Sequence, residues 1–419
     1  MSTRPIWFSG VRAACCAAVV AQALSAQVTA GCNTPTPDPV VHVALPGNPF
    51  TPVPTADGCW ILVAMGGNPA QGSSPGVAVI SRNAGKMTLV RTIPLKSGGS
   101  GAVVTHDGKI LIVAAGPNVA FLDTDRLKSG SGNPVLGYLD VGEGTSALGT
   151  GQAAGAIYVN TTKDDATLFV ALERATAILV VDLTKIRSGS FDSRAVLGRV
   201  PTGNAPIAVT LSSDEKYLYS TSQSSVPSWN WPNACAPENP QQPVYAMTRS
   251  VGAVLIIDVA KTRTDAANSV VMRYPVGCGP VRLVLTPDDR TAWVSLRADN
   301  TLLALDTRKL LTDSAHAIIT KVKVGTAPVG VAVLDGGRRI IATNSNRFAG
   351  DANDRQSLNV LDATKGAASA TLVGVVPAGA FPRELRVTAD GRTLLVSNFA
   401  SKTQQVVDLA RLAPQKSAP

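Results

Sequence analysis

The stretch FPRELRVTADGRTLLVSNFASKTQQVVD, residues 381–408, decides the fold of this 419-residue chain. It contains three short apolar runs. A Thr-x-Asp-Gly turn joins the first run to the second, and the third run ends in aspartate. Short runs of this kind, rich in β-branched residues and bounded by turn residues, predict β-strands.

The same pattern recurs along the chain. Each copy has a turn of the form Ser/Thr-x-Asp-Gly/Asp, and most copies follow one another at intervals of about 50 residues, the size of a four-stranded propeller blade with its loops. The seven turn aspartates are Asp57, Asp107, Asp164, Asp214, Asp288, Asp335 and Asp390. The sequence therefore predicts an all-β fold, a single seven-bladed β-propeller.

The last repeat lacks a fourth strand, because only a short tail follows Asp408. The segment VVHVALPGNP, residues 40–49, precedes the first turn and ends in a Gly-x-Pro corner like those between later blades. We expect it to complete the last blade and close the ring, which removes two free sheet edges. The predicted organisation is a signal peptide at 1–30, a linker at 31–39, the propeller at 40–412 and a tail at 413–419.

The first 30 residues are typical of a secretory signal. Arg4 and Arg12 precede the small-residue apolar run AACCAAVVAQALSA, which is followed by small-x-small cleavage options. The run is shorter than the roughly 18 apolar residues of a membrane-spanning helix, so no integral membrane segment is expected in the mature chain. We predict a secreted or periplasmic protein, with lipoprotein anchoring at Cys32 as a minor alternative, because TAGC faintly resembles a lipoprotein cleavage box.

Removal of the leader leaves four cysteines, which allow three pairings. In the expected blade topology, the long insertion that carries Cys235 opens on the same face as the corner that carries Cys278. Cys59 follows the first turn on the opposite face, and Cys32 enters the closing strand beside it. We therefore predict the disulfides Cys32–Cys59 and Cys235–Cys278, and with them an oxidising compartment.

These repeats, and residues 381–408 best of all, resemble the YVTN family of seven-bladed β-propellers, relatives of the lactonase-type propellers. The resemblance covers nearly all of the mature chain. It implies the fold but no single function, because similar propellers include lactonases and cyclases, subunits of electron-transfer dehydrogenases, surface-layer proteins and plain binding modules.

Charge and composition exclude several function classes. The net charge of +9 is spread over scattered basic residues with no block of five or more, so no nucleic-acid partner is expected. Only three histidines occur, and HExxH, CxxCH and GxSxG motifs are missing, so zinc, copper, haem and nucleophile-elbow chemistry lack support. No cofactor is required. Calcium stays possible, because it needs only oxygen ligands and DANDRQ, residues 351–356, is an acidic loop.

The candidate site follows from repeat position. The residue two after the corner proline begins each inner strand near the central channel, and in blades four to seven it is Ala208, Arg282, Gly330 and Glu384. Buried charges need a partner, water or a ligand, so Arg282 and Glu384 are the candidate catalytic residues. The alternative is a salt bridge across a water-filled channel. Candidate ligand-binding residues on the same rim are Arg383, Arg297, Glu173, Asn344, Arg347 and Asn398.

The insertion VPSWNWPNACAPENPQQPVYAMTR, residues 226–249, is the largest departure from the repeat. Long loops on rigid scaffolds often carry function. Trp229, Trp231 and Tyr245 provide flat surfaces for a sugar ring or a partner chain. The alternative is a self-packed cap whose tryptophans cover the blade edge.

Three functions remain open. The first is a secreted propeller that binds a small anionic or polyhydroxylated molecule, a glycan or a protein partner at its loop-capped channel mouth. The second is a lactonase-like hydrolase, or a lyase, cyclase or isomerase, in which Arg282 polarises an oxygen and Glu384 acts as general base. Lactonase-type propellers often have Pro-Arg-His where this chain has Pro382-Arg383-Glu384, which weakens the hydrolase alternative. The third is an accessory subunit of a periplasmic redox enzyme.

Overall fold

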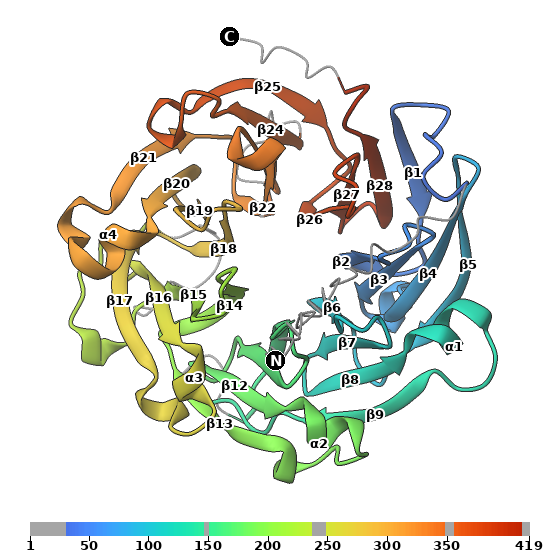
Figure 1. Cartoon of the computed structure of the whole chain (residues 1–419), viewed down its shortest axis with the longest axis horizontal. Coiled ribbons are helices and arrows are strands. Elements are labelled where there is room, and N and C mark those ends of the chain that lie inside the picture. Colours follow the sequence, from blue (N-terminus) through green and yellow to red (C-terminus); the bar gives the residue numbers. More distant parts are fainter. Residues whose placement is uncertain (1–30, 146–150, 237–248, 348–355, 413–419) are drawn as a thin grey trace, which may run out of the picture.

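The computed structural model describes residues 31–145, 151–236, 249–347 and 356–412. Their strands form seven four-stranded sheets arranged in a ring around a central channel (Figure 1). The prediction of an all-β, seven-bladed propeller is therefore confirmed. Each blade runs from an inner strand beside the channel to an outer strand at the circumference.

Blade one consists of β2 (Asn48–Pro54), β3 (Trp60–Gly66), β4 (Gly76–Asn83) and β5 (Lys86–Pro94). Blade two consists of β6 (Ala102–Val104), β7 (Ile110–Ala115), β8 (Asn118–Asp123) and β9 (Val135–Asp140). Blade three consists of β10 (Ala156–Thr161), β11 (Thr167–Leu172), β12 (Ala177–Asp182) and β13 (Val196–Pro201). Blades four and five consist of β14 (Asn204–Leu211), β15 (Tyr217–Ser224), β16 (Gly252–Asp258), β17 (Val270–Gly277); and β18 (Pro280–Leu285), β19 (Thr291–Leu296), β20 (Thr301–Asp306), β21 (Ile318–Lys323). Blades six and seven consist of β22 (Pro328–Leu334), β23 (Arg339–Asn344), β24 (Ser357–Asp362), β25 (Thr371–Pro377); and β26 (Pro382–Val387), β27 (Thr393–Asn398), β28 (Thr403–Asp408), β1 (Val40–Ala44).

Helices are short and lie mainly on the connections between third and fourth strands. They are α1 (Thr124–Ser129), α2 (Leu183–Arg187), α3 (Val259–Thr262) and α4 (Thr307–Thr312), together with the 3-10 turns η1 (Pro69–Gln71), η2 (Ser193–Ala195), η3 (Pro227–Trp229), η5 (Ala266–Asn268), η6 (Ser314–His316), η7 (Asp335–Gly337) and η8 (Ala367–Ser369). The aspartate that ends each of four third strands is the N-cap of the following α-helix, where it accepts backbone N–H bonds. This cap explains why the third-strand motif ends in aspartate.

Hydrogen bonding within the turn explains the Ser/Thr-x-Asp motif. In blade five, the Thr286 hydroxyl donates to Asp288 Oδ1 at 2.6 Å, and the same oxygen accepts the Arg290 N–H at 3.1 Å. The sixth blade departs from this prediction, because Val333 stands where the hydroxyl residue should be. There Asp335 adopts a positive φ of 52° in η7 and pairs with Arg339 instead.

The ring closes as predicted, by pairing of the two ends of the chain. Strand β1 lies antiparallel to β28, with Val40 opposite Val407 and Ala44 opposite Thr403. Figure 1 shows this junction as the meeting of the blue and red ends of the sequence. Arg411 joins the segment before β1 to the last blade, because it donates to the carbonyls of Thr36 and Pro37.

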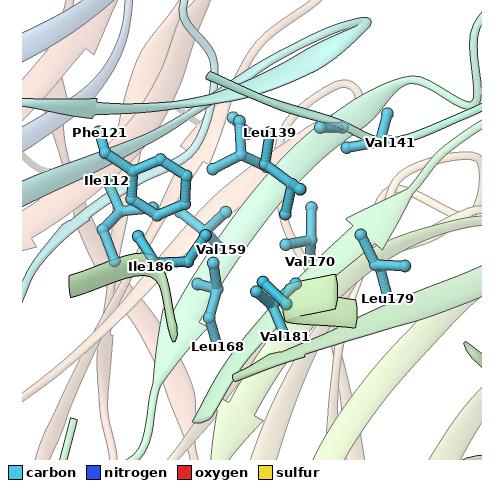
Figure 2. Packing of buried hydrophobic residues seen from close by; sticks show 14 of the residues in the cluster. Ile112, Phe121, Leu139, Val141, Val159, Leu168, Val170, Leu179, Val181 and Ile186 are labelled. Atoms are coloured by element: carbon cyan, nitrogen blue, oxygen red, sulfur yellow. The ribbon is translucent and has the colours of Figure 1, made fainter. Parts of the chain in front are cut away.

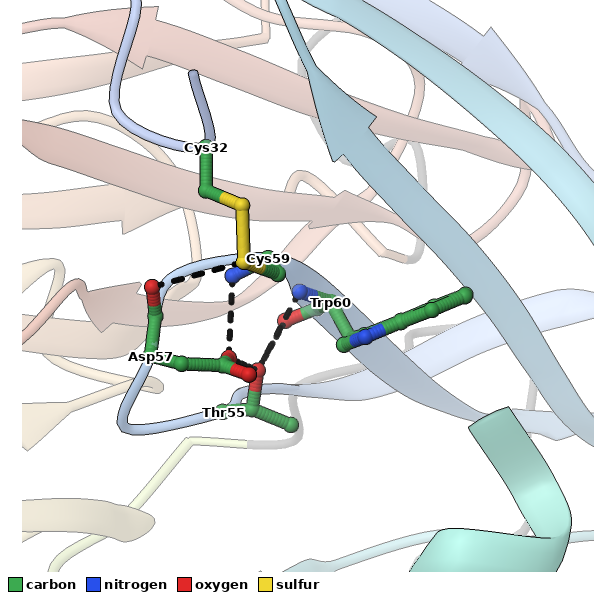
Figure 3. Close-up of a disulfide and its surroundings, with 5 residues drawn as sticks. All are labelled: Cys32, Thr55, Asp57, Cys59 and Trp60. Carbon is green, nitrogen blue, oxygen red and sulfur yellow. Dashed lines mark hydrogen bonds between the residues drawn. A yellow bond between two sulfur atoms is a disulfide. The ribbon is translucent and has the colours of Figure 1, made fainter. Parts of the chain in front are cut away.

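Both predicted disulfides are present, Cys32–Cys59 and Cys235–Cys278. The first is anchored on the first turn, where the Cys59 N–H donates to Asp57 Oδ1 at 3.0 Å (Figure 3). A lipoprotein anchor would use the Cys32 sulfur that the disulfide occupies, so the disulfide disfavours that alternative. The predicted signal peptide and tail lie outside the described residues.

Adjacent blades pack face to face through apolar side chains. Between blades two and three, Ile112 and Phe121 meet Val159, Leu168 and Val170, all of them buried (Figure 2). Because both faces of a blade are covered, its middle strands are apolar on both sides and read as continuous hydrophobic runs. No helix among the described residues is long and apolar enough to cross a membrane.

Three turns contain a further inter-blade contact that sequence analysis missed. Asp165, Glu215 and Asp289 follow the turn aspartate at positive φ angles of 51°, 57° and 55°, where the other standard turns have glycine. Each carboxylate accepts a backbone N–H from the turn of the preceding blade. Asp165 accepts from His106 at 2.9 Å, Glu215 from Lys163 at 2.6 Å and Asp289 from Ser213 at 2.6 Å. The sequence signal is an acidic residue where glycine is conformationally easier.

We predict that Asp165→Ala lowers the free energy of unfolding by about 2–4 kcal/mol, because it removes a buried carboxylate and leaves its hydrogen-bond donors without an acceptor. Asp165 also accepts from the Asp107 N–H and from Arg187. Urea denaturation measures the loss, and the exposed Asp125→Ala is the control. Equal stability of Asp165→Ala and the wild type would contradict the proposed contact.

We also predict loss of stability in acid. Hydrogen bonds from the turn hydroxyls lower the pKa values of Asp164, Asp214 and Asp288 below the ordinary value of 3.8. The unfolded chain therefore takes up protons first as the pH falls, and stability present above about pH 4 is lost below it. Urea midpoints at pH 5 and pH 2.5 test this, and Asp288→Asn should show a smaller difference. A pH-independent midpoint would refute the prediction.

Candidate functional site

Arg282 and Glu384, the predicted pair, meet across the central channel. Arg282 lies on β18 and Glu384 on β26. The Arg282 Nε donates to Glu384 Oε2 at 2.7 Å, and Nη2 lies 2.7 Å from the same oxygen. The side chains are only 5% and 2% exposed. Of the outcomes expected for two buried charges, pairing is the one found.

The other oxygen of Glu384 joins two residues that sequence analysis missed, Arg386 and Tyr158. Glu384 Oε1 lies 3.3 Å from Arg386 Nη1 and 3.4 Å from the Tyr158 hydroxyl. Arg386 also donates to that hydroxyl. Burial raises the pKa of Tyr158, while Tyr158 and Glu384 outweigh burial and raise the pKa of Arg386. We name Tyr158, Arg282, Glu384 and Arg386 the channel network; it contains two cations and one carboxylate.

Small residues make this network possible. A Cβ at Gly330 would lie 3.0 Å from the carbonyl oxygen of Arg383 and 3.3 Å from the Cα of Glu384. A Cβ at Gly101 would lie 2.6 Å from the Cα of Tyr158. The space that a side chain would fill at Gly330 is therefore occupied by the backbone of the next blade, and β26 lies close to β22.

A cavity of about 530 Å³ lies on one side of the channel network. Its lining continues along the inner strands toward the turns between first and second strands. The walls are mainly apolar, and Val103, Val209 and Leu285 are among the residues that line them. Of the predicted site residues, this lining contains Arg282 and Glu384. The predicted rim residues are not part of it.

Arg383 projects to a different environment, a cage of phenylalanine rings. Its guanidinium carbon lies 3.8 Å from the ring centre of Phe50 and 5.3 Å from those of Phe381 and Phe399. The Arg383 Nε is buried and has no hydrogen-bond partner among the described residues. Burial lowers the pKa of Arg383 to about 9. The side chain is thus an electrostatically unfavourable cation that stays charged at neutral pH.

Four other predicted residues act on the charge of Arg383. Arg347, Arg282 and Arg297 lower its pKa further, and Glu173 opposes them. Arg297 is buried and donates to Gln223 Oε1 at 2.6 Å, whereas Arg347 is exposed beside Phe381. We name Arg282, Arg297, Arg347 and Arg383 the rim arginine cluster.

Asn344 and Asn398, also predicted to bind a ligand, form hydrogen bonds within their own blades. Asn344 Nδ2 donates to Ser357 and Asn359, and Asn398 Nδ2 donates to Thr403 and Gln405. A Cβ at the corner glycines Gly325 and Gly379 would lie 2.6 and 2.8 Å from the amide carbons of Asn344 and Asn398. These asparagines therefore pack under the corners that precede their inner strands.

The tryptophans of the long insertion are half-buried on blade four. The rings of Trp229 and Trp231 lie 4.9 Å apart, and both pack against an apolar cluster that includes Val259. Arg273 stacks on Trp229 at 5.6 Å. This packing agrees with the self-packed cap. Tyr245 and most of the acidic loop at 351–356, the predicted calcium candidate, lie outside the described residues.

Within the described ranges, no cluster of three or more His, Cys, Asp or Glu side chains could hold a metal ion. No protein-family model matches the sequence, and no curated protein matches it. Among solved structures, the chain is similar to "Kuenenia stuttgartiensis Hydrazine Synthase", with a TM-score of 0.62, 16% identity and coverage of 88% of this chain and 97% of that chain. It is also similar to a chain of "Crystal Structure of Mitotic Checkpoint Complex", with a TM-score of 0.60, 12% identity and coverage of 97% and 99%. At these identities the likeness shows the propeller fold alone.

We predict that Glu384→Gln destabilises the protein by about 3–5 kcal/mol, because it leaves the buried Arg282 and the partly exposed Arg386 without a carboxylate. The double variant Arg282→Met/Glu384→Leu should recover part of the loss, since it removes both members of the pair. Urea denaturation gives both values, with the surface variant Asp335→Asn as control. A Glu384→Gln variant as stable as the wild type would show that the network does not hold the channel together.

Proposed function

We propose that this protein is a secreted or periplasmic β-propeller that binds a small anionic molecule at the rim arginine cluster. The observation that carries the proposal is Arg383, a cation in an aromatic cage whose Nε has no partner among the described residues. Arg383 is half-buried, and a cation that is partly removed from water without a carboxylate partner is costly. An anionic ligand would remove that cost on binding.

The chemistry of the cluster favours a carboxylate or phosphate group. A guanidinium presents a planar fork of N–H donors that matches such groups with two parallel hydrogen bonds. Phe50, Phe381 and Phe399 hold the Arg383 fork by cation–π attraction and limit its movement. Three further arginines supply positive potential, and Glu173 offers one acceptor for a hydroxyl of the ligand. A sugar acid combines these groups.

Binding is favoured over catalysis by the state of Glu384. Each carboxylate oxygen already has a cation or a phenol as partner. To act as general base, Glu384 would require the channel network to open. A lactonase-like, lyase or isomerase activity therefore ranks second, and the resemblance to YVTN-repeat and lactonase-type propellers is compatible with either function.

Protein partners and a redox-enzyme subunit remain alternatives of a different class. One of the similar solved chains belongs to a structure named as a complex, which makes a protein partner plausible for a propeller of this shape. The arginine cluster at the rim nevertheless favours a small anion as the first ligand to test.

Arg383→Met tests the proposal, because methionine fits an aromatic cage without charge. We predict that this variant folds with at least wild-type stability in the absence of ligand and loses the binding of galacturonate and gluconate at the rim. Thermal unfolding should be measured with galacturonate, gluconate and inorganic phosphate, and with galactose as neutral probe. An acid at about one hundred times its dissociation constant should stabilise the wild type by about 2.7 kcal/mol.

The control is Arg194→Met, which removes an exposed arginine paired with Asp192. This control should keep the full response to the acids. An acid-induced shift of equal size in Arg383→Met would show that the ligand binds elsewhere, and silence of the wild type across the three acids would refute a small-anion site.

A further inference from the structure

The seam where the ring closes contains another buried arginine, Arg82. It lies on β4 of blade one and reaches across to blade seven, where its Nη2 donates to the Thr393 hydroxyl at 3.2 Å. Arg82 is 5% exposed. Its Nε is buried and has no hydrogen-bond partner among the described residues. No carboxylate in the described part of the chain forms an ion pair with it.

A cavity of about 290 Å³ adjoins this side chain. Three arginines line it, Arg82, Arg392 and Arg411, but only one carboxylate, Asp408. Asp408 is already paired, because Arg411 Nε lies 2.6 Å from its Oδ2. The lining thus has an excess of positive charge that belongs to Arg82 and Arg392.

The lowered pKa of Arg82 agrees with this excess of positive charge. Burial lowers its pKa, and the charges of Asp390 and Asp408 act in the opposite direction. Those carboxylates are too far away to form an ion pair with Arg82. The Nε of Arg82 therefore remains a buried donor without an acceptor, in a residue that lines the cavity, and this indicates a missing acceptor group.

We propose that the seam cavity binds a small oxyanion, a carboxylate or phosphate group, between Arg82 of blade one and Arg392 of blade seven. The occupant would match the unpaired guanidinium charge with charge-assisted hydrogen bonds. It would also join the first blade to the last, beside the β1–β28 pairing and the Cys32–Cys59 disulfide. Binding therefore strengthens ring closure and is separate from the rim arginine cluster.

The test is thermal unfolding of the disulfide-bonded protein in inorganic phosphate, acetate or chloride at constant ionic strength. All variants are made in the Arg383→Met background, which lacks the proposed rim site. This background should show a saturable rise in melting temperature of about 2 °C or more with millimolar phosphate or acetate relative to chloride. General salting-out by phosphate rises without saturation and affects every variant alike. A response to phosphate alone would identify a phosphate group as the ligand.

Arg82→Met should abolish the saturable rise, and the exposed Arg392→Gln, which changes no buried contact, should weaken it at least threefold in apparent affinity. The matched control is Arg194→Met, which removes an exposed arginine and should leave the rise unchanged. An undiminished rise in both Arg82→Met and Arg392→Gln would overturn the seam site. So would the absence of any saturable rise in the Arg383→Met background, because the rim arginine cluster cannot supply the response there.

Discussion

Closure of the ring by β1 and β28 is the constraint on which the rest of the structure depends. Each blade buries both of its faces against neighbours, so an open ring would expose two apolar faces at once. The pairing of Val40 with Val407 joins residues from opposite ends of the chain. The Cys32–Cys59 disulfide and the contacts of Arg411 reinforce the same junction. Several independent interactions therefore converge on the place where the fold is most vulnerable.

Closure also creates the channel, and the channel network spans it. Tyr158, Arg282 and Glu384 come from blades three, five and seven, and they meet only because the ring is complete. A buried ionic network of this kind is weak evidence for stability in itself, because desolvation offsets most of the attraction. Its consequence here is spatial. Arg282 belongs to both the channel network and the rim arginine cluster, so the network links the apolar cavity to that cluster.

Repeat position predicted some of the contacts at the channel and missed others. Arg282 and Glu384 were found because each follows a corner proline, which marks the start of an inner strand. Tyr158 has no such proline before it, and Arg386 was available only through the two-residue periodicity of β26. Asn344 and Asn398 form hydrogen bonds within their own blades that the sequence did not predict, because an amide at the end of a second strand has the same sequence signature whether it faces a ligand or its own blade.

By itself, the sequence determined the number of blades, the closing strand and both disulfides. These features depend on local turn chemistry, on apolar periodicity and on the sidedness of loops, all of which are repeated along the chain. Only the tertiary structure decided which charges meet. The partners of Glu384 are separated from it by as many as 226 residues. The Nε of Arg383 has no hydrogen-bond partner among the described residues, because three phenylalanines from two blades surround the side chain. Such contacts depend on ångström-scale distances between blades, and a repeat pattern contains no information about those distances.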